Sequence, residues 1–227
     1  MKKTIGGIET EIIIKNVKNI SIKVKDGGEV VLTVPKGRDI AAAEQFFVSK
    51  LNWIIKNKNK SSYFKPCEVV DNGRIFLFGE EVTLKTIESE KNRAYFKDGI
   101  LYVFFNGKKD LKRITEDYLK TELNEKLKVT FEKWTKITEL YPSSVSIRKT
   151  TSKWGSCTPK TRKIRMSIYL AGLPTFCVEY VTLHELLHIR YPDHGKDFKA
   201  ALSYYMPQWT NIRKFMRENG GKMRVKL

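Results

Sequence analysis

The sequence predicts an α+β protein in two parts. The first part, over residues 1–107, is a β-rich region with one helix, and the second, over residues 108–227, is a mostly helical domain with a small sheet beside a central apolar helix. Short β-branched or alternating segments separated by glycine turns dominate the first part, as is typical of strands. Apolar residues at helical spacing dominate the second part.

Strands in the first part are predicted wherever short segments alternate or are rich in β-branched and aromatic residues. These segments span residues 12–14, 20–25, 30–34, 74–78, 82–87, 93–96 and 101–105. Asp26-Gly27-Gly28 predicts a hairpin turn between the second and third of them. Residues 39–57 predict one amphipathic helix with Asp39 as its N-cap, and residues 56–65 a basic, polar linker.

The second part opens with a long helical pattern over residues 109–136. Two short strands are then expected over residues 145–148 and 164–168. A strongly apolar helix follows, and Pro174 is a typical residue for its start. The remaining elements are a helix over residues 196–205, a last helix that ends near residue 218, and a frayed basic tail over residues 222–226.

All three histidines of the chain lie between residues 184 and 194, and the first two belong to an H-E-x-x-H motif. His184 and His188 share one face of the predicted helix, so both imidazoles can reach one metal ion. Pro192 stops the helix, which lets the chain turn and bring His194 back as a third ligand. Glu185 can reach a water molecule at such a metal, as the general base of a zinc peptidase does.

Three neutral imidazoles and one open position are what a catalytic zinc ion needs, so one Zn²⁺ per chain is predicted. Glu185 would take a proton from the zinc-activated water as it attacks a peptide carbonyl, and would pass it to the leaving amine. In the alternative interpretation, the helix is simply buried and its histidines make ordinary hydrogen bonds. A purely structural zinc site would have no use for Glu185.

A formal net charge of +18 suggests a polyanionic partner. Residues 108–227 carry 25 basic and 12 acidic side chains, so most of the excess lies in the half with the H-E-x-x-H motif. The candidate contacts for nucleic acid, or for a protein bound to it, are Lys149, Lys153, Arg162 and Lys163. No nucleic-acid-binding motif accompanies them, and a basic surface without a specific partner is the alternative.

Three widely spaced cysteines, Cys67, Cys157 and Cys177, form no C-x-x-C motif and indicate reduced thiols and a cytoplasmic location. The first residues are basic but lack the apolar stretch of a signal peptide. No apolar run approaches the length that spans a bilayer, so no membrane partner is expected.

The combined motifs resemble the YgjP-like metallopeptidase family, a cytosolic zincin group related to the SprT-like proteases. The resemblance is carried by the block over residues 149–158, by the H-E-x-x-H region with His194-Gly195 and Phe198, and by Met206-Pro207. It covers nearly the whole chain, although Lys153 stands where the family usually has arginine. It implies a zincin-type catalytic domain with His184, His188 and His194 as ligands and Glu185 as the catalytic acid/base residue.

The candidate residues of a substrate cleft are Trp154, Gly155, Arg165 and Tyr204. A peptide substrate is expected to lie extended along an edge strand near residues 164–168. Cys157 could be a nucleophile, but a thiol that braces a glycine turn is the favoured interpretation because no further histidine is available as its base. The predicted function is therefore a zinc metallopeptidase. The alternatives are a basic nucleic-acid-associated zinc protein and a zinc hydrolase of non-peptide amides or esters.

Overall fold

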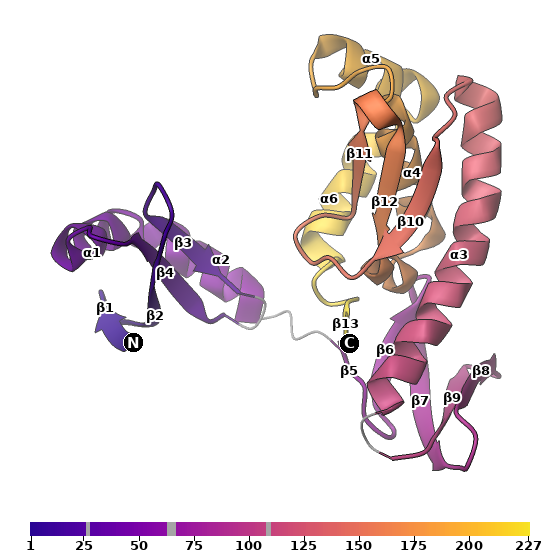
Figure 1. Cartoon of the computed structure of the whole chain (residues 1–227), viewed down its shortest axis with the longest axis horizontal. Helices are drawn as coiled ribbons and strands as arrows, with labels where there is room; N and C mark the ends of the chain where they lie inside the picture. The colour runs from indigo at the N-terminus through magenta and orange to yellow at the C-terminus, as the bar shows by residue number, and fades with distance from the viewer. Residues whose placement is uncertain (26–27, 63–66, 108–109) are drawn as a thin grey trace. The chain divides into compact units, whose positions relative to one another are not determined.

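The computed structural model describes residues 1–25, 28–62, 67–107 and 110–227, and it confirms a mixed α and β fold. The chain forms two compact units, Met1–Pro66 and Cys67–Leu227 (Figure 1). Each unit has its own hydrophobic core. This division falls after Pro66, whereas the sequence analysis placed a division after residue 107. The reason is that Leu84 and Leu101 of the later strands share one core with Leu119 of the long helix.

The first unit is a four-stranded sheet with two helices. Its strands are β1 (Lys2–Ile5), β2 (Ile8–Lys15), β3 (Ser21–Val24) and β4 (Val30–Pro35), in the order β1-β2-β4-β3. The strands β3 and β4 pair antiparallel as expected, but residues 26–27 of the predicted turn lie outside the described residues. The strand β1 was not expected from the sequence.

One helix was predicted over residues 39–57, but the structure has two, α1 (Ile40–Ser49) and α2 (Leu51–Ser62). Asp39 caps α1 as predicted, because its side chain accepts a hydrogen bond from the backbone N–H of Ala41 at 3.0 Å. The break falls at Lys50, whose backbone leaves the helical region. The helix α2 occupies most of the expected linker, and residues 63–66 lie outside the described residues.

The second unit begins with the short strand β5 (Cys67–Glu68) and a four-stranded sheet. This sheet has the order β6-β7-β9-β8 and consists of β6 (Arg74–Leu77), β7 (Glu80–Glu88), β8 (Arg93–Lys97) and β9 (Ile100–Phe105). The long helix α3 (Asp110–Thr138) runs past this sheet and on to the rest of the unit (Figure 1). Its buried face, which includes Leu119, Leu123 and Leu127, joins the two halves of the unit into one core.

A three-stranded sheet lies beside the helix that carries the histidines. Its strands are β10 (Ser144–Arg148), β11 (Gly155–Thr158) and β12 (Lys163–Ser167), in the order β10-β12-β11. The expectation that residues 164–168 form an edge strand is therefore wrong, since β12 is central. The free edge near the histidines belongs to β11, which the sequence did not reveal as a strand because Gly155 and Ser156 have low strand propensity.

The helix α4 (Thr175–Leu187) carries the H-E-x-x-H motif. It ends at Leu187, with His188 as its C-cap, before Pro192. There the last turn tightens, because the N–H groups of Ile189 and Arg190 donate to carbonyls three residues earlier, at 3.0 and 3.1 Å. The helices α5 (Lys196–Tyr205) and α6 (Trp209–Asn219) follow near their predicted positions. Two short 3-10 helices, η1 (Pro159–Thr161) and η2 (Ile168–Gly172), flank β12.

The predicted fraying of the basic tail is wrong, because the tail forms the strand β13 (Val225–Lys226). It pairs in parallel with β5. Val225 is buried, and Arg224 stacks over the ring of Trp154 at 4.6 Å and over that of Tyr169 at 5.7 Å. These apolar and aromatic contacts, together with the strand pairing, order the tail. Across the described part of the chain, no helix combines the length and the apolar character that crossing a membrane requires.

Candidate metal centre

The three histidines converge on one point although they come from different segments. His184 and His188 lie one turn apart on α4, with ring centroids 4.9 Å apart. The turn after α4 returns His194 to the same place, where its Nε2 lies 3.0 Å from the Nε2 of His184. One ligand atom from each of the three lies within 4.8 Å of the others.

Neighbouring groups fix the rings in this position. Nδ1 of His188 lies 2.9 Å from the carbonyl oxygen of Tyr191, so this nitrogen donates and leaves Nε2 free as a ligand. Phe198 of α5 is buried and packs against all three rings at centroid distances of 4.7–4.9 Å. The N–H of Gly195 donates to Oδ1 of Asp193 at 2.7 Å, which stabilises the turn that carries His194.

The electrostatics of the cluster suit a metal cation. Burial, with smaller contributions from the nearby His188, His194 and Arg213, lowers the pKa of His184 to about 3. Burial also lowers the pKa of His188, against the opposing effect of the Tyr191 carbonyl. Both rings therefore stay neutral at physiological pH, which is the form that binds a metal. Nitrogens bound to a tetrahedral zinc at about 2.0–2.1 Å lie roughly 3.3–3.5 Å apart, so these residues fit the ion.

Glu185 lies beside the cluster, packed against β11. A Cβ at Gly155 would lie 2.6 Å from Oε1 of Glu185, so only glycine allows this approach. Burial raises the pKa of Glu185 to about 7, while the Lys153 ammonium and the donating backbone N–H of Cys157 act in the opposite direction. Its Oε2 is buried and, among the described residues, has no hydrogen-bond partner. A carboxyl with this pKa and a free oxygen can both accept and return a proton near neutral pH.

A cavity of about 410 Å³ opens beside Glu185. It contains two of the predicted cleft residues, Trp154 and Gly155, but neither Arg165 nor Tyr204. Arg165 pairs with Ser156 in register and so lies on the opposite face of the sheet from Gly155. The whole lining consists of Trp154, Gly155, Tyr180, Val181, His184, Glu185, Arg213, Met216 and Arg217.

Tyr180, Arg213 and Arg217 were not identified from the sequence. Tyr180 precedes His184 by one helical turn, and this spacing could have indicated it. The two arginines lie on α6, and their position depends on how α6 packs against α4. No local sequence pattern encodes that packing.

Of the four candidate polyanion contacts, only Lys153 acts on the metal centre, through its charge near Glu185. Lys149 forms an ion pair with Glu116 at 2.9 Å, and Arg162 follows η1 in a left-handed conformation. Lys163 opens β12, where it is exposed opposite Thr158. The structure therefore does not gather these four side chains into one surface at the site.

Two further features are separate from the chemistry of the histidines. Burial raises the pKa of the Cys157 thiol to about 11, so the thiolate that a nucleophile requires is disfavoured.

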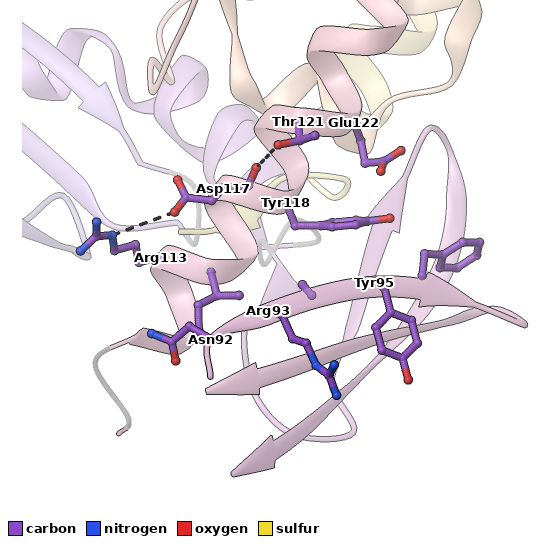
Figure 2. Close-up of a pocket in the computed structure, with 11 residues that line it drawn as sticks. Asn92, Arg93, Tyr95, Arg113, Asp117, Tyr118, Thr121 and Glu122 are labelled. Atoms are coloured by element: carbon purple, nitrogen blue, oxygen red, sulfur yellow. Dashed lines mark hydrogen bonds and ion pairs between the residues drawn. The ribbon is translucent and has the colours of Figure 1, made fainter. Parts of the chain in front are cut away.

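A wider cavity of about 780 Å³ lies between β8 and α3, lined by residues such as Arg93, Asp117 and Tyr118 (Figure 2). Among the described residues of its lining there is neither histidine nor cysteine, and the carboxylates are those of Asp117 and Glu122.

Comparison with known proteins yields one matching family model and several similar solved structures, among them two metallopeptidase zymogens. Residues 18–219 match the family model described as YgjP-like, metallopeptidase domain. The metallopeptidase zymogen of Methanocaldococcus jannaschii jannalysin is 21% identical over 41% of this chain and 88% of that one, with a TM-score of 0.38. The metallopeptidase zymogen of Pyrococcus abyssi abylysin is 18% identical over 44% and 99%, also with a TM-score of 0.38. No curated protein matches the sequence significantly.

Proposed function

Because the chain belongs to the YgjP-like family of metallopeptidases, we propose that it is a zinc peptidase with His184, His188 and His194 as ligands and Glu185 as general base. One observation carries the proposal: the three histidines converge on one point, and one of them, His184, lines the same cavity as the buried carboxyl of Glu185. A metal-dependent hydrolase follows from the family, whereas the identity of the metal and the role of Glu185 are inferred from the site.

The histidines, Glu185, Cys157 and Lys153 have different roles in the proposed reaction. Bound at the histidines, zinc would supply a Lewis acid that polarises the scissile carbonyl and lowers the pKa of a water molecule. Glu185 accepts the proton of the attacking water on its free Oε2 and returns it to the leaving amine. The N–H of Cys157 holds the carboxyl in place, and the Lys153 ammonium limits the rise in its pKa.

The free edge of β11 is the expected site for the peptide backbone. Among the described residues, the strand pairs with β12 on one side only, so an extended substrate can add to its other side. Gly155 at the start of β11 contacts Glu185, and a peptide on this edge would therefore bring its scissile bond close to the general base. A protein or peptide is the substrate class. We expect a cytoplasmic location because the three cysteines are free thiols.

Glu185→Gln tests the proposed role directly, and the same helix offers a matched control. Glu179 is also on α4, but it forms an ion pair with Lys133 at 3.0 Å, away from the cavity. Glu185→Gln should keep zinc and lose about 10²–10⁴-fold in peptide hydrolysis, whereas Glu179→Gln should stay close to the parent. Activity of Glu185→Gln within threefold of the parent would show that Glu185 is not the base.

Elemental analysis of purified protein tests the metal. We expect about one zinc per chain in the parent and a strong loss in His188→Ala, since that variant removes one of three ligands. Undiminished zinc in His188→Ala would contradict the ligand assignment. Full zinc content without cleavage of any peptide in a broad library would instead favour a hydrolase of non-peptide amides or esters.

A further inference from the structure

We propose that Arg213 and Arg217 bind a carboxylate of the substrate, so that the peptidase prefers an acidic side chain or a free C-terminus near the scissile bond. This inference rests on the proposed peptidase function and specifies its substrate class. Both arginines line the cavity that contains His184 and Glu185.

Helical geometry places the two arginines on one face of α6. They are four residues apart, so their side chains leave the helix on the same side and can act together on one group. Met216, which lies between them in sequence, is buried and also lines the cavity. The helix is thus anchored by its apolar residues, while the charged groups remain available to solvent and substrate.

The charge of these arginines is not neutralised within the protein. In the described part of the chain, Arg213 makes neither an ion pair nor a hydrogen bond, and its side chain is exposed in the cavity lining. Arg217 approaches Glu218 only at 3.8 Å, and because both side chains are exposed this pair contributes little. Among the described residues of the lining, Glu185 is the one acidic residue, and it is buried against Gly155 rather than paired with either arginine.

A carboxylate is the ligand that this chemistry selects from a peptide. Unmodified peptides carry negative charge only on aspartate, glutamate and the C-terminus. The planar guanidinium group binds carboxylates with two parallel hydrogen bonds, which fixes their orientation as well as their charge. Hydrogen bonds between charged groups typically change affinity by about 10–100-fold, and we expect a preference of that size.

Peptide pairs of matched length test the proposal with the zinc-loaded full chain. One pair exchanges Glu for Gln beside the cleaved bond, and the other exchanges a free for an amidated C-terminus. We expect the parent to cleave the carboxylate member of at least one pair about 10–100-fold more efficiently in kcat/KM. The pair that responds identifies whether the side chain or the terminus is bound.

The arginine variants separate recognition from a structural role. The ratio of kcat/KM within the responding pair should fall towards one in Arg213→Gln and Arg217→Gln, and should reverse in favour of the uncharged member in Arg217→Glu. Lys214→Gln is the control, because Lys214 is an exposed cation on the same helix outside the cavity lining. A ratio near one in the parent, or a preference that survives when both arginines are replaced by Gln, would overturn the proposal.

A binding measurement keeps this test independent of catalysis. Fluorescence anisotropy of the same labelled peptides with zinc-loaded Glu185→Gln should show tighter binding of the carboxylate member, and the arginine variants should abolish the difference. Equal binding of both members would refute carboxylate recognition. If the peptides bind with this preference but the parent cleaves none of them, the proposed peptidase function fails and the subsite stands.

Discussion

Gly155→Ala is the substitution for which the structure gives the most direct prediction. The added Cβ would lie 2.6 Å from Oε1, 2.7 Å from Cγ and 2.9 Å from Cδ of Glu185. Ordinary contacts between such atoms are about 3.5–4.0 Å, so the whole side chain of Glu185 would have to retreat by about 1 Å. The helix α4 cannot move with it because Leu183, Leu186 and Leu187 are buried in the core.

A displacement of about 1 Å at a catalytic group typically costs about 10²-fold in rate. We therefore expect kcat/KM of Gly155→Ala to fall about 10²-fold while zinc content stays at the parent level. The backbone at Gly155 does not need a positive φ, so alanine adds no backbone strain there. The loss should thus come from the position of Glu185 rather than from unfolding.

The test measures kcat/KM by peptide cleavage, zinc content by elemental analysis and stability by thermal melting, all on the same preparation. Ser156→Ala is the matched control, because its side chain lies on the opposite face of β11, beside Arg165. That variant should stay within about threefold of the parent. Gly155→Ala with full zinc and activity within threefold of the parent would refute the reasoning, since Glu185 would then tolerate the displacement.

Three further predictions test other parts of the structure. Arg224→Ala removes a cation that stacks on Trp154 in the cavity wall. We therefore expect a loss of about 0.5–2 kcal/mol in the free energy of unfolding and a several-fold lower kcat/KM. An unchanged melting temperature and unchanged turnover would contradict a role of Arg224 in supporting Trp154. Leu123→Ala, at a fully buried position on α3, should lower the free energy of unfolding in denaturant by about 2–5 kcal/mol. Val129→Ala, at an exposed position on the same helix, should change it little. Equal effects of the two variants would argue against α3 as the helix that both halves of the core share. If the basic surface binds nucleic acid, titration of labelled DNA should show affinity that falls steeply with salt, and reversing the charges of Arg162, Lys163 and Arg165 should weaken it for all sequences. Absence of binding at physiological salt would leave a peptidase without a nucleic-acid partner.

The sequence predicted best what depends on neighbours along the chain. The spacing of His184 and His188 follows from one turn of helix, and the cap at Asp39 from one side chain and one nearby N–H. The long helix over residues 110–138 was also expected, since its apolar spacing extends over many turns.

What the sequence missed depends on contacts between distant segments. The face on which Arg165 lies is set by the register of β11 and β12, and one residue of shift would reverse it. The place of Arg213 in the cavity depends on the packing of α6 against α4. The order of tail residues 225–226 comes from pairing with Cys67, more than 150 residues earlier.

That pairing gives the second unit a mechanical property. The N–H of Cys67, its first residue, donates to the carbonyl of Arg224 at 2.8 Å, and the guanidinium of Arg224 covers Trp154 in the cavity wall. Tension applied to the segment that enters this unit therefore acts first on a residue in contact with the cleft. The strands β5 and β13 pair over only two residues each, and such a small contact opens locally at a low free-energy cost. Opening of the β5–β13 pair would thus release Arg224 from the cleft wall while the buried core of the second unit stays folded.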